Sequence, residues 1–220
     1  EEISKLPTKI KKKVNFDLNI IKKKKHFKNL KLKSFPIIMG ILNMTPDSFS
    51  DGGKYNKYSL AKKQLNHLFD SGSVLVDIGG ESTRPGSKAV NSNVEWNRVK
   101  NILEKFSKKK FISLDTRKSD VMENGIKKGI KIINDVSGLN YDKKSIHILK
   151  KYKTPFVLQH SLKNPDIMQD NPKYKNVLLD IYDFFHEKIN FLRNFGISHN
   201  NIILDPGIGF GKNLKHNITI

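Results

Sequence analysis

Six short apolar runs, each followed by an amphipathic stretch, are the feature that most constrains the fold of this chain. The runs predict strands at residues 37–42, 74–78, 111–115, 130–134, 154–159 and 202–205. Amphipathic stretches predict helices at residues 58–71, 94–106, 119–128, 143–152 and 174–195. Strands that alternate with helices favour a parallel sheet with helices outside it. We therefore expect an α/β domain over residues 34–220.

Polar side chains lie at or beside the end of every predicted strand. An aspartate in such a position is often only a turn former or a helix cap. Six in succession are hard to explain by capping alone, because the carboxyl ends of parallel strands meet at one end of the fold, where ligands bind. The residues are Asn43, Asp77, Asp115, Asn134 with Asp135, Gln159 with His160, and Asp205.

Three of the loops after these strands have compositions that suit a ligand site. Residues 43–53 form a long loop of the kind that often closes over a site as a lid. Residues 79–87 offer backbone N–H groups, hydroxyls and Arg84, a set that suits an oxyanion such as pyrophosphate. Residues 205–212 contain three glycines, which allow close approach to a ligand, and Lys212, which offers a cation.

The positive charge of the chain is concentrated near its start. The net charge is +20, and residues 1–33 hold 12 Lys against 3 acidic residues. We interpret this segment as a solvated leader or linker, with a polyanion-binding arm as the alternative. The chain has 37 Lys and only 4 Arg, whereas nucleic-acid surfaces normally use Arg as well, so no nucleic-acid partner is expected.

Two further absences in the sequence exclude classes of protein. There is no Cys, which excludes a disulfide scaffold and a thiolate metal site and fits a reducing, cytoplasmic compartment. No apolar run approaches the roughly 20 residues of a membrane span, so no membrane partner is expected.

Five segments resemble, in order and spacing, the motifs of the dihydropteroate synthases in the pterin-binding family. They read IMGILNMTPDSFSDGG at 38–53, VDIGGESTRPG at 76–86, SLDT at 113–116, IINDVSG at 132–138 and LDPGIGFGK at 204–212. The resemblance implies a (β/α)8 TIM-type barrel with about six of its eight βα units in this chain. It also implies condensation of 6-hydroxymethyl-7,8-dihydropterin pyrophosphate with p-aminobenzoate, which gives 7,8-dihydropteroate and pyrophosphate in folate biosynthesis.

The resemblance assigns the pterin pocket to Asp115, Asn134 and Asp205, with Asp77 as a structural or pterin-adjacent carboxylate. The chemistry agrees, because a pterin edge carries adjacent N–H donors and a carboxylate can accept two such bonds. The family also implies Mg²⁺ as cofactor, with Asn43 as its ligand, since an amide oxygen suits a hard cation.

The remaining roles implied by the resemblance lie in the loops. Thr83 would bind pyrophosphate, and Arg84 would act from a mobile loop. The first loop would close over the site through Asp47, Phe49 and Asp51, with Asp51 stabilising a cationic pterin methylene. The aminobenzoate slot would be walled by Phe49, Pro85 and Phe210, and Lys212 is expected to contact substrate.

The sequence departs from the family at its end. A seventh-strand Ser-Arg-Lys motif and an eighth-strand Arg-x-His motif are absent from these 220 residues. We therefore expect a fragment of a longer protein or a truncated, non-catalytic remnant. A pterin-dependent methyltransferase is a further alternative, disfavoured by the Thr-Pro-Asp-Ser-Phe-Ser-Asp loop at 45–51. The expected partners are the two small substrates, and a homodimer or a fusion to another folate enzyme stays open.

Overall fold

The computed structural model describes residues 2–22, 36–45, 54–82, 87, 89–162 and 171–220. The chain divides into two compact units, Glu1–Phe35 and Pro36–Ile220. The first unit contains a short 3-10 helix, η1 (Glu2–Lys5), and the helix α1 (Thr8–Lys22). Neither helix was predicted, because the many lysines of this segment obscure the spacing of its apolar residues.

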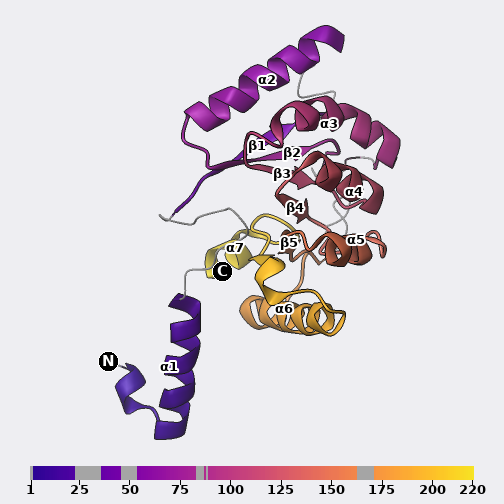
Figure 1. The fold of residues 1–220 in the computed structure, drawn as a ribbon. Helices are drawn as coiled ribbons and strands as arrows, with labels where there is room; N and C mark the ends of the chain where they lie inside the picture. Colours follow the sequence, from indigo (N-terminus) through magenta and orange to yellow (C-terminus); the bar gives the residue numbers. More distant parts are fainter. Residues whose placement is uncertain (1, 23–35, 46–53, 83–86, 88, 163–170) are drawn as a thin grey trace. The chain divides into compact units, whose positions relative to one another are not determined.

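The second unit is built on a single parallel sheet. Its six strands are hydrogen-bonded in chain order (Figure 1). They are β1 (Met39–Asn43), β2 (Leu75–Gly79), β3 (Ile112–Asp115), β4 (Ile132–Asp135), β5 (Phe156–Gln159) and β6 (Ile202–Asp205). All six predicted strands are therefore confirmed, and their order is that of consecutive units in a (β/α)8 barrel.

Helices connect the strands, and the first four of them pack against one another in chain order (Figure 1). They are α2 (Lys54–Asp70), α3 (Ser92–Phe106), α4 (Ser119–Lys128), α5 (Ser145–Tyr152) and α6 (Val177–Asn194). A 3-10 helix, η3 (His199–Asn201), precedes β6, and α7 (Leu214–Thr219) follows it. The five predicted helices are confirmed, whereas η3 and α7 were not predicted because they are too short to show a period.

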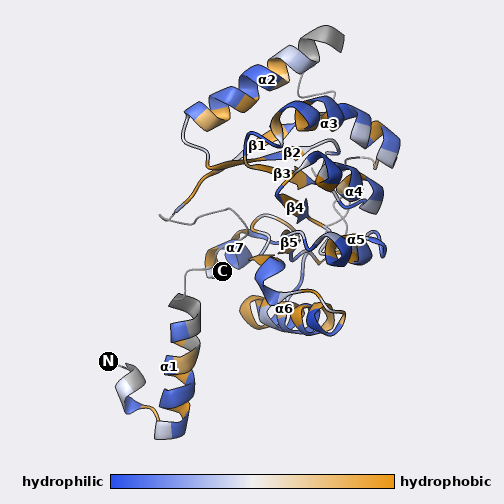
Figure 2. Cartoon of the chain, viewed as in Figure 1, coloured by the Kyte–Doolittle hydropathy of each residue, from blue (hydrophilic) through white to orange (hydrophobic). Residues whose placement is uncertain are grey.

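The hydrophobic core fills the space between the sheet and these helices. Figure 2 shows the hydrophobic colour on the strands, with much of the helix surface hydrophilic. Gly125 of α4 illustrates how closely the layers approach, because a Cβ there would collide with the side chain of Leu114. Fully buried members from both layers include Leu65, Ile78, Val99, Ile102, Leu103, Leu114, Met122, Ile133, Leu149, Phe156, Leu158 and Leu192.

The two edge strands, β1 and β6, carry apolar side chains that the described residues leave uncovered. Ile41 in β1 is 63% exposed, and Leu204 in β6 is 45% exposed. Side chains of the inner strands β2 and β3 are almost all buried, and each inner strand has another strand hydrogen-bonded on either side. The sheet is therefore apolar at both of its open edges.

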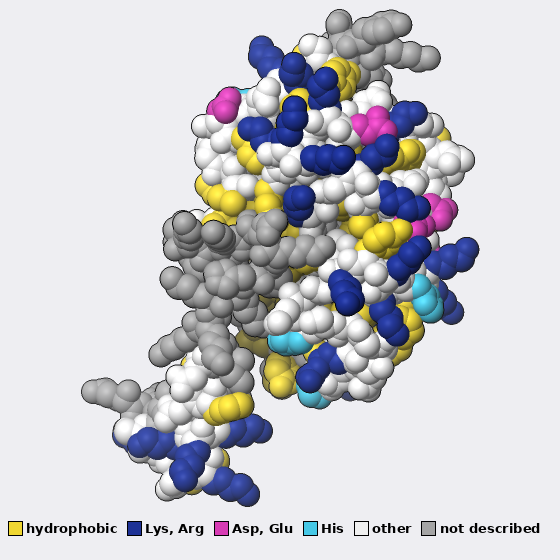
Figure 3. All heavy atoms as spheres, in the orientation of Figure 1, with side chains coloured by type: hydrophobic (Ala, Val, Ile, Leu, Met, Phe, Trp, Pro, Cys, Tyr) yellow, Lys and Arg dark blue, Asp and Glu magenta, His cyan; other side chains and the backbone are white. Residues whose placement is uncertain are grey.

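The surface of the second unit carries scattered positive charge. Figure 3 shows Lys and Arg side chains distributed over the visible face, with few acidic side chains among them. Among the described helices, none combines the length and apolar character needed to cross a membrane.

Candidate active site

One row of residues crosses the sheet at the carboxyl ends of its first four strands. The register pairs Asn43 with Gly79, Gly79 with Asp115, and Asp115 with Asn134. Residues paired across parallel strands point to the same face of a sheet. In β1 this face is the more exposed one, since Gly40 and Leu42 point to the buried side. The structure thus brings together three of the predicted site residues.

Gly79 leaves room for the polar side chains on either side of it. A Cβ at this position would lie 3.2 Å from Asp115 Oδ2 and 3.6 Å from Asn43 Oδ1. The glycine therefore lets both oxygens lie close to the backbone of β2. Sequence analysis did not single out Gly79, although a glycine at a strand end between two polar strand ends could have indicated a close approach.

Asp77 lies one row deeper, paired with Ile41 and Ser113. The strand continues two residues beyond it to Gly79, so the expectation that Asp77 marks the end of its strand is wrong. Asp77 is 5% exposed, and its carboxylate accepts a 2.8 Å hydrogen bond from Nδ2 of Asn134. Burial raises the pKa of Asp77, and the side chains of Ser113 and Asn134 oppose that rise.

Asp115 has a strongly perturbed carboxyl group. Burial is the main cause that raises its pKa well above the usual range, and the negative charges of Asp77, Glu95, Asp135 and Glu81 add to it. An ionised Asp115 is therefore costly unless a bound group supplies hydrogen-bond donors. Such a perturbed group beside other polar strand ends is typical of a functional site.

Several buried polar atoms at or near this row have no hydrogen-bond partner among the described residues. Two belong to amide side chains, Oδ1 of Asn134 and Nε2 of Gln159, and others to the carboxylates of Asp77 (Oδ1) and Asp135 (Oδ2). Buried polar atoms in proteins are nearly always paired, so unpaired ones at a strand end suit a ligand that supplies the partner. Of the two amide atoms, the one in Asn134 accepts and the one in Gln159 donates, which suits a ligand that carries both donors and acceptors along one edge.

Asp205 begins the glycine-rich loop after β6 and is paired in register with Gln159. Its Oδ1 accepts a 2.7 Å hydrogen bond from the backbone of Gly207, and its carbonyl accepts one from His160. Gly207 has φ of +68°, and a Cβ there would collide with the carbonyl of His160. The loop is therefore tied closely to the end of β5.

Lys212 is placed within this loop rather than in the row of strand ends. Its ammonium is buried and donates to the carbonyls of Gly207 (3.0 Å) and Phe210 (2.9 Å), and it lies 3.1 Å from Nδ1 of His160. Burial lowers the pKa of Lys212 to about 8, although Asp205 opposes the shift. Burial, with the charge of Lys212, lowers the pKa of His160 to about 4. The substrate-contact roles of Lys212 and Phe210 stay predictions.

The other predicted site residues lie outside the described residues. They are Asp47, Phe49 and Asp51 in the first loop, and Thr83, Arg84 and Pro85 in the second. Their roles are therefore still predictions.

A buried ionic cluster beside the row was not predicted. Glu81 forms salt bridges of 2.8 Å with both Arg117 and Lys118, and Lys118 also lies 2.5 Å from Glu95. The guanidinium of Arg117 stacks over Tyr141 at 4.0 Å. Glu81 stands within one of the family motifs, but the sequence does not indicate the cluster because the partners of Glu81 come from other elements.

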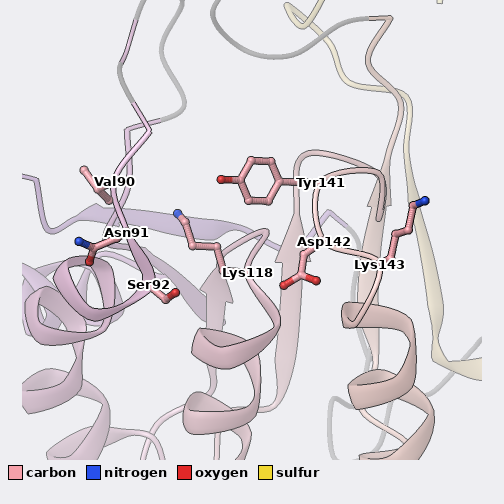
Figure 4. A pocket seen from close by; sticks show the side chains of 7 residues that line it. All are labelled: Val90, Asn91, Ser92, Lys118, Tyr141, Asp142 and Lys143. Atoms are coloured by element: carbon pink, nitrogen blue, oxygen red, sulfur yellow. The ribbon is translucent and has the colours of Figure 1, made fainter.

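A hollow of about 410 Å³ lies beside this cluster. Figure 4 shows Lys118 and the ring of Tyr141 near each other at the hollow, with Lys143 directed away from them. The lining of the hollow therefore includes the ammonium of Lys118, which is already paired with the carboxylates of Glu81 and Glu95. The lining residues are Val90, Asn91, Ser92, Lys118, Tyr141, Asp142 and Lys143.

The oxygen ligand that Asn43 offers would suit a metal ion whose other ligands come mainly from a substrate. Among the described residues, no group of three or more His, Asp or Glu side chains is placed to hold an ion. Asn43 offers one amide oxygen beside the space above Gly79. Mg²⁺ is commonly held in this way, by one or two protein oxygens together with substrate phosphates and water.

Comparisons with known proteins agree with this geometry. Residues 39–220 match the family described as pterin binding enzyme. The dihydropteroate synthase of Clostridium beijerinckii is 44% identical over 184 residues, which are 82% of this chain and 65% of that protein. A structure of the Yersinia pestis dihydropteroate synthase with a sulfonamide drug superposes with a TM-score of 0.79 at 39% identity, covering 86% of this chain and 69% of that one.

A second solved structure adds a ligand to the comparison. The Xanthomonas albilineans dihydropteroate synthase with 4-aminobenzoic acid superposes with a TM-score of 0.76 at 36% identity, covering 84% of this chain and 66% of that one. The chain thus spans about two thirds of the length of these relatives. These matches, together with the row of strand ends and the barrel order of the strands, show that the chain belongs to the pterin-binding enzyme family.

Proposed function

We propose that this protein is a dihydropteroate synthase of folate biosynthesis. The observation that carries the proposal is the row of Asn43, Gly79, Asp115 and Asn134 on one face of the sheet, with Asp77 bonded to Asn134 beneath it. The row offers carboxylate and amide groups at the place where a parallel α/β fold binds its ligand. The relatives named above carry the same activity in their names.

In this proposal the row holds the pterin ring. Asp115 accepts two N–H bonds from the aminopyrimidinone edge, which offsets the cost of ionising a buried carboxyl group. Oδ1 of Asn134 accepts a further bond, and its orientation is set by the bond from its Nδ2 to Asp77. Asp205, at the end of β6, completes the proposed pocket.

The proposed reaction joins the amine nitrogen of p-aminobenzoate to the methylene carbon of the pterin. The carbon–oxygen bond to pyrophosphate breaks, the pyrophosphate leaves with the bonding electrons, and the amine loses a proton. Because the leaving group is highly charged, cations and N–H donors around it lower the barrier. Thr83 and Arg84 are proposed for this task, with Mg²⁺ held by Asn43 supplying charge neutralisation when bound.

The first loop and the aromatic side chains complete the proposed site. Asp47 and Asp51 close over the reacting atoms, and Asp51 stabilises positive charge on the methylene carbon. The aminobenzoate ring lies between Phe49, Pro85 and Phe210, with Lys212 contributing through the shape of its loop. These roles rest on the resemblance of the two loops to family motifs.

The proposed active form is a closed barrel in which further βα units cover β1 and β6. The exposure of Ile41 and Leu204 supports this, because apolar side chains of a barrel are normally buried. We further propose a cytoplasmic protein in which residues 1–33 act as a leader or linker. A homodimer or a fusion to another folate enzyme would fit that organisation.

The test is synthesis of dihydropteroate by the full-length protein with the two substrates and Mg²⁺. Formation of 7,8-dihydropteroate and one equivalent of pyrophosphate, lost in the Asp115→Asn variant, supports the proposal. An Asp120→Asn variant is the matched control, because Asp120 is exposed on α4. Tight pterin binding without product would instead identify a non-catalytic remnant and overturn the proposed activity.

A further inference from the structure

The carboxylate of Glu81 joins the two ends of one loop to a neighbouring strand. Glu81 follows β2 directly, and its Oε1 accepts a 2.9 Å hydrogen bond from the backbone of Val90, nine residues later. The same carboxylate binds Arg117 and Lys118, which follow β3. A second contact between the loop ends runs from the hydroxyl of Ser87 to the carbonyl of Ser82. The start and the end of the loop are thereby held together.

The surrounding packing leaves Glu81 little freedom to move. Arg98 of α3 donates a 2.7 Å hydrogen bond to the carbonyl of Gly80, the residue before Glu81. A Cβ at Gly80 would lie 2.7 Å from the carbonyl of Glu95, so only glycine allows α3 this close to β2. The side chains of Glu81 and Glu95 are 6% and 0% exposed. The carboxylate therefore sits in a rigid, buried frame.

The charges in this frame balance among themselves. Two carboxylates, Glu81 and Glu95, face two cations, Arg117 and Lys118. Burial alone would raise the pKa of Glu81, but hydrogen bonds from Arg117, Lys118 and Val90 outweigh it and lower the pKa. A buried ion pair adds little net stability over an apolar packing, yet it fixes one geometry because any displacement leaves a charge unpaired.

We propose that Glu81 is a positioning residue for the described ends of the loop after β2, which are Ser82 at its start and Ser87 and Val90 at its end. It sets the separation of the two loop ends and, through Arg117 and Lys118, ties them to the segment that follows β3. The inference rests on the proposed function, in which this loop binds the pyrophosphate of the pterin substrate. Small displacements of such a loop matter, since a misplacement of about 1 Å can cost roughly a hundredfold in rate.

Glu81→Gln in the full-length protein separates positioning from general stability. The glutamine amide would place a donor against the donors of Arg117, Lys118 or Val90, so the loop ends should shift. We expect kcat/KM for the pterin pyrophosphate substrate to fall roughly ten- to a hundredfold. Affinity for 6-hydroxymethylpterin, which has no pyrophosphate, should not fall, because Glu81 is the weakest of the charges that raise the pKa of Asp115 and its removal favours the ionised form that binds the pterin.

The matched control is Glu104→Gln, which makes the same chemical change in an exposed ion pair with Lys128. It should leave both measurements unchanged. Glu81→Asp keeps the charge but shortens the side chain, and it should show the same selective loss in a weaker form. In Glu81→Gln, an equal fall in kcat/KM and in 6-hydroxymethylpterin affinity, or no fall in kcat/KM, would overturn the positioning role.

Hydrogen exchange at the Val90 amide tests the inference without relying on catalysis. We expect this amide to be protected in the wild-type protein and to exchange faster in Glu81→Asp, while protection in β3 is retained. Equal exchange in the two proteins, or no protection in the wild type, would overturn the role. If the wild-type protein makes no dihydropteroate, the proposed function fails by itself, and the exchange result still decides whether Glu81 holds the loop.

Discussion

The side-chain amide of Asn134 donates a 2.8 Å hydrogen bond to the carboxylate of Asp77, which ties β4 to β2 across the intervening strand β3. Asp115 lies on that intervening strand, one row above Asp77 and beside Asn134 in register. The bond fixes the orientation of the amide, because Nδ2 must face Asp77. Oδ1 of Asn134 is then fixed as an acceptor beside the carboxylate of Asp115.

Asp115→Asn should weaken pterin binding by at least about tenfold, because one carboxylate oxygen becomes a donor that faces the donors of the pterin edge. The measurement is titration calorimetry of the full-length protein with 6-hydroxymethylpterin. Asp120→Asn, a change at an exposed position, should bind as the wild type does. An unchanged pterin affinity in Asp115→Asn would contradict the assignment of this pocket.

The raised pKa of Asp115 predicts that pterin binding releases protons. Burial and nearby carboxylates favour the protonated form of free Asp115, whereas N–H donors from a pterin favour the ionised form. Affinity should therefore weaken as the pH falls through the raised pKa. Calorimetry in two buffers of different ionisation enthalpy measures the protons released.

Asp77→Asn supplies the matched variant for that experiment. Removing the charge of Asp77 should lower the pKa of Asp115, so the loss of affinity should move to lower pH, while an amide oxygen can still accept from Asn134. An identical pH profile in the variant and the wild type would show that Asp77 does not act on Asp115 through its charge.

Sequence analysis could place the strands and the polar strand ends because both depend on local pattern. An apolar run bounded by turn residues identifies a buried strand, and the order of units then brings Asn43, Asp115 and Asn134 to one end of the sheet. The depth of Asp77 was missed because it depends on where β2 ends, and strand boundaries are set by pairing with neighbours.

Environments made by distant residues could not be predicted in this way. Lysine side chains are usually exposed, yet Lys212 is buried with its ammonium 3.1 Å from Nδ1 of His160, which lies 52 positions earlier in the chain. The ion pair between Glu81 and Arg117 joins residues 36 positions apart. Neither contact has a local signature in the sequence, because each is created by the tertiary arrangement of loops.

Gly79→Ala should impair ligand binding while leaving the core intact. The added Cβ would lie 3.2 Å from Asp115 Oδ2, which is closer than most such contacts, so the carboxylate must move. We expect pterin affinity to fall roughly tenfold. The midpoint of urea unfolding should be nearly unchanged, because the atoms nearest the added Cβ belong to Asp115 and Asn43 and not to the hydrophobic core. Binding equal to that of the wild type would contradict the close approach at this position.

Asp135 should make the protein less stable as the pH rises from about 4 to about 7. The carboxyl group is fully buried, and burial raises its pKa from 3.8 to about 6, although hydrogen bonds from Ser137 oppose the rise. The folded protein thus holds a proton that the unfolded chain has released, so this stabilisation is complete below about pH 4 and is lost through about pH 6. The loss is at most about 3 kcal/mol.

Asp135→Asn removes this titration and provides the comparison. The difference in free energy of unfolding between the wild type and the variant, measured by urea denaturation of the full-length protein, should shift against the wild type as the pH rises through that window. The other buried carboxylates remain in both proteins, so their contributions largely cancel. A difference that is constant with pH would mean that Asp135 titrates alike in the folded and unfolded states, and that its burial is compensated by neighbouring charges such as that of Arg117.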